Sequence, residues 1–162
     1  MSVATSLSPL APPQVSSAVA SRDLLAAIAG GLAASLSDVH TDPATDREWT
    51  GGERTWEQLL ATDAYDAWLI RWPAGTSVGP HDHGGSSGAF AVVSGTLVEV
   101  TAELAGTRVA VHATGSTRAF AADVVHDVAN AGPDAAVSVH VYAPPLTTMR
   151  RYVWAPAGTE AA

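Results

Sequence analysis

The chain has 162 residues, a formal net charge of −8, and neither lysine nor cysteine. This length is typical of one domain with a real core. The negative charge argues against binding to nucleic acid or to an anionic membrane surface. The lack of cysteine excludes disulfides and cysteine-ligated metal sites. No signal peptide and no membrane-spanning stretch is predicted, so we expect a soluble, cytoplasmic monomer.

The N-terminal third predicts one long helix between two irregular segments. Residues 1–20 are rich in Ser, Ala and Pro, and we expect them to form a disordered tail. Ser21 is the expected N-cap, because apolar residues then recur at helical spacing over Arg22–Leu36. Residues 38–53 are polar and predict a loop, and residues 55–60 predict a short helix.

From residue 65 onwards, short apolar runs alternate with turn residues. Such regular spacing predicts an antiparallel sandwich or barrel, and a double-sheet jelly roll with the helix packed outside suits the number of runs. We therefore expect a single all-β domain over residues 21–152, with its barrel at about 64–152, and a loose tail over 153–162. The predicted strands are 67–72, 89–93, 97–101, 108–111, 124–128 and 136–142.

A first glycine-framed motif carries two histidines. It runs from Gly75 through His81 and His83 to Gly88 and Gly95. Side chains alternate along an extended segment, so histidines at i and i+2 point to the same face. Imidazoles are frequent metal ligands, and this pair inside its frame predicts a metal site rather than two unrelated surface residues.

A second frame, formed by Gly115, His126 and Asn130, lies further along the chain. Alone, a single histidine such as His126 is more often an ordinary residue than a ligand, but its frame favours the metal interpretation. Three histidines leave positions open on a metal, which indicates chemistry rather than structural support. Asp82 should point away from the two histidines that flank it and hold the adjacent turn.

The expected strand at 136–142 has one polar and one apolar face, because Ser138, His140 and Tyr142 alternate with valines. One interpretation is a polar face turned to solvent. An inward orientation requires that the three groups bond to one another, since unpaired polar groups are costly inside a barrel. His40 and His112 have no motif around them, and we expect both at the surface.

The two frames together resemble the two sequence motifs of the cupin superfamily. The chain departs from them at Gly88, where the first motif often has Glu, and at Ala121 and Asp123, where the second often has Pro and Gly. A three-histidine site without an anionic ligand, followed by residues 138–145, is similar to the cysteine dioxygenase family of thiol dioxygenases. The similarity covers about residues 54–151.

This resemblance implies a cupin fold, a double-stranded β-helix barrel, with Fe(II) as cofactor. It implies that L-cysteine and O2 are the substrates and that cysteine sulfinic acid is the product. Many family members cross-link a cysteine to a tyrosine, but Gly88 takes the cysteine position here. The chain therefore resembles the bacterial type without the cross-link. The implied site consists of the metal ligands His81, His83 and His126, the catalytic residues Tyr142, His140 and Ser138, and the substrate-binding Arg54.

Several alternatives stay open at this point. Arg54 would clamp a substrate carboxylate through two parallel hydrogen bonds, but without the resemblance it is an ordinary solvated arginine, and Arg71 is a substitute. The substrate could be 3-mercaptopropionate or another small thiol. A non-catalytic cupin that binds a metal or a ligand is the rival from another class. Ligand type alone would let Cu, Ni or Zn bind more tightly than Fe(II).

Overall fold

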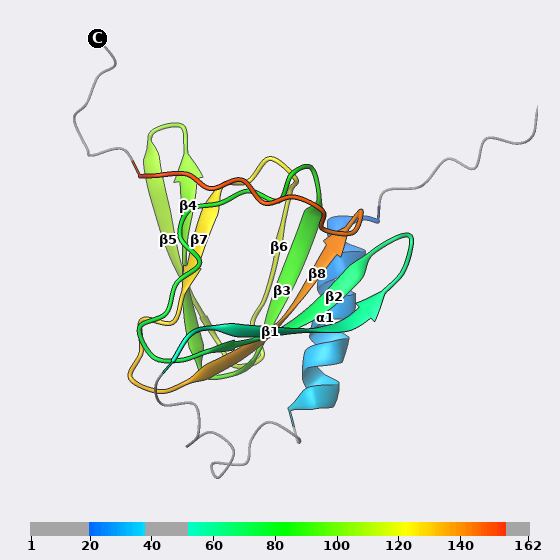
Figure 1. The fold of residues 1–162 in the computed structure, drawn as a ribbon, viewed down its shortest axis with the longest axis horizontal. Coiled ribbons are helices and arrows are strands. Elements are labelled where there is room, and N and C mark those ends of the chain that lie inside the picture. The colour runs from blue at the N-terminus through cyan, green and yellow to red at the C-terminus, as the bar shows by residue number, and fades with distance from the viewer. Residues whose placement is uncertain (1–19, 38–51, 155–162) are drawn as a thin grey trace, which may run out of the picture.

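The computed structural model describes residues 20–37 and 52–154 (Figure 1). Most of the predicted disordered and loose tails, most of the predicted 38–53 loop, and His40 lie outside these described residues. Within the described ranges, no helix is long and apolar enough to cross a membrane. The elements are α1 (Arg22–Leu36), β1 (Thr55–Ala61), β2 (Asp66–Trp72), β3 (Ser87–Ser94), β4 (Thr96–Glu103), β5 (Gly106–Ala113), β6 (Thr117–Phe120), β7 (His126–Ala129) and β8 (Ala136–Ala143).

The strands form two antiparallel sheets. The five-stranded sheet has the order β1-β2-β8-β3-β6, and the three-stranded sheet has the order β5-β4-β7 (Figure 1). Aromatic and aliphatic side chains from both sheets meet between them. This arrangement confirms the predicted all-β jelly roll, and β2, β3, β4, β5, β7 and β8 each overlap a predicted run.

Helix α1 has the bounds that its apolar spacing predicted. The hydroxyl oxygen of Ser21 accepts a hydrogen bond from the Leu24 N–H at 3.2 Å, which satisfies one of the free amides of the first turn. Leu25, Ala29 and Ala33 are buried and lie on one face of the helix. The N-cap and the spacing of these side chains are both local features of the sequence.

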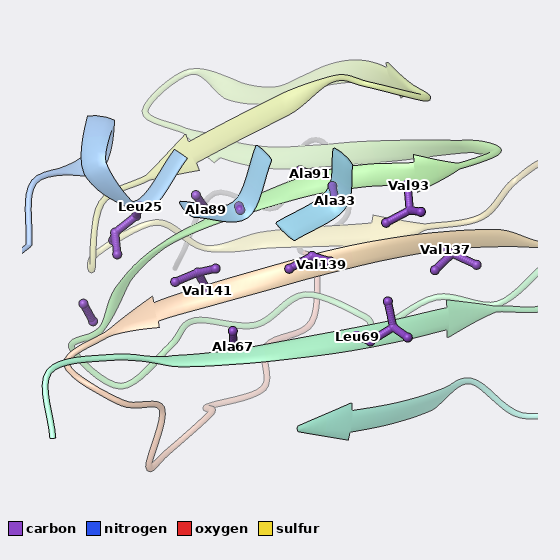
Figure 2. Packing of buried hydrophobic residues seen from close by; sticks show 12 residues of the cluster. Leu25, Ala33, Ala67, Leu69, Ala89, Ala91, Val93, Val137, Val139 and Val141 are labelled. Carbon is purple, nitrogen blue, oxygen red and sulfur yellow. The ribbon is translucent and has the colours of Figure 1, made fainter. Parts of the chain in front are cut away.

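The helix covers the outer face of the five-stranded sheet (Figure 2). The valines of β8 pack against the helix, and the residues between them point into the barrel because side chains alternate along a strand. The same alternation turns Phe90 and Val92 of β3 inward. Ser138, His140 and Tyr142 therefore reach the barrel interior and not solvent.

Leu25→Ala is expected to destabilise the fold by roughly 2–5 kcal/mol, because Leu25 is fully buried between the helix and the sheet. The neighbouring Leu24 is 51% exposed, so Leu24→Ala should change the free energy of unfolding by less than about 0.5 kcal/mol. Urea unfolding of both variants measures the difference. A Leu25→Ala loss as small as that expected for Leu24→Ala would mean that Leu25 contributes little packing energy.

The predicted short helix at residues 55–60 is wrong. The segment forms β1, which pairs with β2 at the edge of the five-stranded sheet. A helix of this length gains few hydrogen bonds for a costly nucleus, whereas a strand added to an existing edge gains a ladder at once. The short, polar β6, which pairs with β3, also carried no signal that its sequence would form a strand.

Candidate metal centre

Three histidines converge inside the barrel. His81 and His83 lie in the segment between β2 and β3, and His126 is the first residue of β7. The backbone N–H groups of His81 and His126 donate to each other's carbonyl oxygens at 2.9 and 3.0 Å, which fixes the two segments side by side. All three side chains are buried, and their potential ligand atoms lie within 4.8 Å of one another. The cluster could hold a metal ion.

In the rings of His81 and His126, a hydrogen bond at one nitrogen determines which nitrogen is free to bind a metal. The Nδ1–H of His81 donates to the Gly79 carbonyl oxygen at 2.8 Å, and the Nδ1–H of His126 donates to Glu99 Oε1 at 2.7 Å. Both partners only accept, so Nε2 of each ring carries a free lone pair. Neither nitrogen of His83 has a hydrogen-bond partner among the described residues. A bound metal would satisfy a buried nitrogen that is otherwise unpaired, so the donor set fits a metal.

The rings of His81 and His83 are neutral near pH 7. Burial lowers the pKa of His81 to about 4; the adjacent His126 lowers it further, and the hydrogen bond to Gly79 opposes this shift. Burial lowers the pKa of His83 to about 3, with His126 and His81 acting in the same direction. Neutral imidazole is the form that binds metals, so no proton has to leave these rings first.

Asp82 stabilises the segment that carries His81 and His83. Its carboxylate accepts hydrogen bonds from the Gly84 N–H at 3.0 Å, from Arg150 Nε at 2.8 Å and from the Tyr152 hydroxyl at 2.6 Å. The expected bond to the adjacent turn is present, and the same carboxylate also ties down the segment after β8. Charge-assisted bonds of this kind hold both segments in place.

Ser138, His140 and Tyr142 form a buried chain of hydrogen bonds along β8. Trp72 Nε1–H donates to Ser138 Oγ at 2.8 Å, Ser138 Oγ lies 2.9 Å from His140 Nε2, and the Tyr142 hydroxyl lies 3.3 Å from His140 Nδ1. Burial lowers the pKa of His140 well below its usual value and raises the pKa of Tyr142. Near pH 7 the chain therefore contains a neutral imidazole and a protonated phenol.

Arg54, just before β1, points its guanidinium into the same region. Its charge lies over the rings of Trp72 and Trp56, at 5.0 and 5.8 Å from their centroids. Its buried Nε and Nη1 have no hydrogen-bond partner among the described residues. Burial lowers the pKa of Arg54, and nearby Arg151 adds to the effect. A half-buried guanidinium with two buried donors that are unpaired among the described residues is a suitable partner for an anion.

Arg71, the alternative to Arg54, faces elsewhere. On β2 it alternates with Ile70 and Trp72, whose side chains belong to the barrel interior. Its guanidinium lies 3.7 Å from the Glu57 carboxylate. The structure therefore brings Arg54, and not Arg71, to the histidine cluster.

Two cavities give access to this region. The inner cavity, of about 40 Å³, touches His81, His126 and His140, and the outer cavity, of about 240 Å³, is lined mainly by apolar side chains. Arg54 and Tyr142 line both cavities, together with Ile70 and Met149. The outer lining consists of Arg54, Trp56, Trp68, Ile70, Tyr142, Leu146, Met149 and Arg151.

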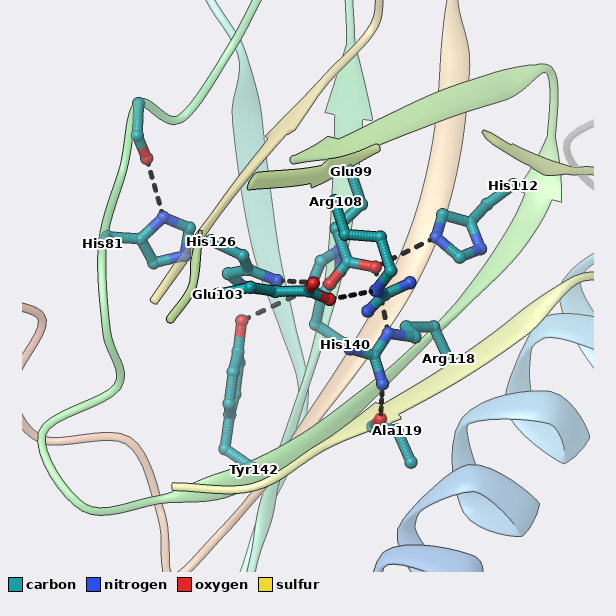
Figure 3. A network of polar contacts seen from close by, with 11 residues as sticks. His81, Glu99, Glu103, Arg108, His112, Arg118, Ala119, His126, His140 and Tyr142 are labelled. Atoms are coloured by element: carbon teal, nitrogen blue, oxygen red, sulfur yellow. Dashed lines mark hydrogen bonds and ion pairs between the residues drawn. The ribbon is translucent and has the colours of Figure 1, made fainter. Parts of the chain in front are cut away.

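Glu99 is a site residue that the sequence interpretation missed. It is fully buried on β4, and its carboxylate accepts hydrogen bonds from His126, from His112 Nε2 at 3.1 Å and from Arg118 Nε at 2.9 Å (Figure 3). Burial alone would raise the pKa of Glu99, but these three hydrogen bonds outweigh it and hold the pKa well below its usual range. The available signal was alternation, because Glu99 shares the inward face with Leu97.

His112 was expected at the surface, and this prediction is wrong. Its side chain on β5 is 12% exposed and donates to Glu99. Its ring also lies edge-on to Phe90, with centroids 5.0 Å apart. The inward orientation follows from the pairing of β5 with β4, which no motif around His112 indicated.

Gly88 pairs with Tyr142 across the β3–β8 ladder, as expected for the position that faces the tyrosine. A Cβ atom at Gly88 would lie 2.5 Å from the Phe120 ring and 3.0 Å from Tyr142. Phe120 fills this space and stacks on His83, with ring centroids 4.6 Å apart. The Phe120 and Tyr142 ring centroids lie 6.3 Å apart, so a second aromatic ring lies near the tyrosine beside Gly88.

An antiparallel jelly roll with a buried three-histidine cluster defines a cupin barrel. The family model for cysteine dioxygenase type I matches residues 47–154, and the chain belongs to this family. No curated protein matches the chain in sequence.

Solved structures share the fold at low identity. A Klebsiella pneumoniae protein with a double-stranded β-helix domain has a TM-score of 0.54 and 20% identity, over 64% of this chain and 90% of that one. The Thermus thermophilus protein TT1209 has a TM-score of 0.54 and 20% identity, over 65% and 96%. The cupin domain of Schizosaccharomyces pombe Cnp3 has a TM-score of 0.51 and 12% identity, over 56% and 60%. These likenesses show the fold alone.

Proposed function

We propose that the chain is a non-haem iron thiol dioxygenase that oxidises L-cysteine with O2 to cysteine sulfinic acid. The observation that carries the proposal is the buried three-histidine cluster, two of whose members, His81 and His126, line one cavity with Arg54 and Tyr142. The overall change, RSH + O2 → RSO2H, places both oxygen atoms on sulfur and reaches the sulfinic level of thiol oxidation. Family membership supports the reaction class.

His81, His83 and His126 would hold the iron, each through one imidazole nitrogen. Three neutral ligands leave its positive charge uncompensated within the cluster, which favours the approach of an anionic thiolate. Bound Fe(II) would supply the redox chemistry that lets O2 react with a thiolate. The protein's part is to hold the ligands, orient the substrate and exclude water.

Arg54 is the residue that we propose binds the substrate carboxylate. Its Nε and Nη1 donors are buried and unpaired among the described residues, and tryptophan rings fix the guanidinium plane. A substrate carboxylate would accept two parallel hydrogen bonds from the guanidinium and complete the site. The thiol end of a small substrate held there would then point along the inner cavity towards the histidines.

Tyr142 is the group that we propose donates a hydrogen bond into the cavity where the substrate would react. In one arrangement of the protons, Trp72 donates to Ser138, Ser138 donates to His140, and the Nδ1–H of His140 donates to the tyrosine oxygen. The phenol proton of Tyr142 then remains available to the cavity. It can donate a hydrogen bond to the substrate or to an oxygen atom, and His140 and Ser138 position it for this.

Two rivals remain. A dioxygenase for 3-mercaptopropionate or another small thiol would use the same residues, because these acids also carry a carboxylate for Arg54. A non-catalytic cupin would bind a metal or ligand without consuming oxygen. The predicted monomeric state and cytoplasmic location, and the absence of nucleic-acid or membrane partners, belong to the same proposal.

A panel of thiols tests the function. The protein is loaded anaerobically with Fe(II), and oxygen uptake and products are then measured with cysteine, 3-mercaptopropionate and cysteamine. We expect uptake with cysteine and stoichiometric sulfinic acid. A higher kcat/KM for 3-mercaptopropionate would move the assignment to the first rival, and no thiol-dependent uptake by iron-loaded protein would favour the second.

Tyr142→Phe is expected to lower turnover by up to about tenfold, the equivalent of one neutral hydrogen bond, while iron stays bound. His140→Ala should show the same pattern, because it removes the group that orients the phenol. Iron content and steady-state rates check both variants. Parental turnover in both would mean that this chain of hydrogen bonds supports the fold alone.

A further inference from the structure

One of the three clustered histidines, His126, is hydrogen-bonded to a buried carboxylate, that of Glu99. Glu99 Oε1 accepts the Nδ1–H of His126 at 2.7 Å, and the Glu99 side chain is fully buried. The other oxygen, Oε2, accepts from His112 on the neighbouring strand β5 and from Arg118 on β6 of the other sheet. Both oxygens are thus engaged by defined partners, which fixes the carboxylate in one orientation.

His126 differs from the other two histidines in this respect. The ring of His81 donates to a neutral backbone carbonyl, and His83 has no ring partner among the described residues. Only the His126 ring, within this cluster, is bonded to a full negative charge. A carboxylate bonded to the far nitrogen of an imidazole fixes its tautomer and makes its free nitrogen a stronger donor.

We infer that Glu99 is a positioning residue that supplies, through His126, the negative charge that the three neutral histidines lack. This inference rests on the proposed function, because it assigns Glu99 a role towards the same metal. Charge placed one hydrogen bond from a ligand strengthens metal binding, and it stabilises the ferric state more than the ferrous state.

Arg118 reduces the effect of the Glu99 charge on the metal. Its Nε donates to the same carboxylate at 2.9 Å, so its positive charge offsets part of the charge on Glu99. The Arg118 side chain is 24% exposed, so its replacement is less disruptive than a change at a fully buried position. Removal of Glu99 and removal of Arg118 should therefore shift the metal's potential in opposite directions, although both break the same ion pair.

The test uses Glu99→Gln, Arg118→Gln and the control Glu103→Gln. Glu103 lies on the same strand and pairs with Arg108 at 2.9 Å, but its side chain is 51% exposed. Fe(II) affinity is measured anaerobically against a competing chelator, the ferric/ferrous midpoint potential by redox titration, and the fold by circular dichroism. Glu99→Gln should bind Fe(II) on the order of 10- to 100-fold more weakly and shift the potential upwards.

Arg118→Gln should bind Fe(II) at least as tightly as the parent and shift the potential downwards, while Glu103→Gln should match the parent. A folded Glu99→Gln variant with parental affinity would overturn the inference. So would potential shifts of the same sign in the Glu99 and Arg118 variants. If Glu99→Gln does not fold, the Arg118→Gln potential decides: a downward shift supports the role, and no shift or an upward shift contradicts it. Failure of the parent to bind Fe(II) would instead contradict the proposed function.

Discussion

His81→Ala is expected to lose its bound iron and all thiol-dependent oxygen uptake while the barrel stays folded. The variant removes one of three ligands, and the two that remain cannot hold Fe(II) against solvent. Folding should survive, because the core consists of apolar side chains on both faces of the five-stranded sheet. Metal analysis, oxygen uptake and circular dichroism on the same sample measure the three properties.

His140→Ala is the matched control for this variant. His140 is also a buried histidine that lines the inner cavity, but it belongs to the β8 hydrogen-bond chain and not to the ligand cluster. It should keep its iron and retain a reduced turnover, lower than the parent's by up to about tenfold. A His81→Ala variant that retains a full equivalent of iron would show that the metal is bound elsewhere. Zinc in a purified sample would not, since expression conditions select among metals.

Arg54→Ala should lower kcat/KM for cysteine by about tenfold to a hundredfold. The charge-assisted interaction with the carboxylate is expected to contribute about 1.5–3 kcal/mol in total, and about 1.4 kcal/mol corresponds to tenfold. Cysteamine lacks the carboxylate, so it should be a poor substrate of the parent and lose little more in the variant. Steady-state kinetics with both thiols give the comparison.

Arg71→Ala is the control, because this arginine lies on the other face of β2 beside Glu57. It should leave the kinetics of both thiols near the parental values. Equal losses of kcat/KM for cysteine and cysteamine in Arg54→Ala would mean that Arg54 supports the fold through its tryptophan contacts and binds no carboxylate.

Structural features that depend on residues close together in the sequence were predictable. Ser21 and the apolar spacing after it determine α1, and the glycine frames identify the three histidines that converge. Segment 55–60 was not predictable in this way, because its strand depends on the edge that β2 offers. Local propensity carries no information about that edge.

Glu99 illustrates the same limit inside the site. Its inward position follows from alternation with Val98 and Val100, but its partners come from three other strands, one of them in the other sheet. His112 and Arg118 lie on β5 and β6, and only the register of these strands brings their side chains to one carboxylate. A sequence without an alignment cannot supply that register.

Oxidation of cysteine under ¹⁸O2 tests the central claim most directly. Iron-loaded protein is mixed with cysteine and ¹⁸O2 in ordinary water, and the product is analysed by mass spectrometry. The proposed function predicts cysteine sulfinic acid that carries two ¹⁸O atoms, with one O2 consumed for each thiol. Product oxygen derived from water, or the disulfide cystine as the only product, would contradict it.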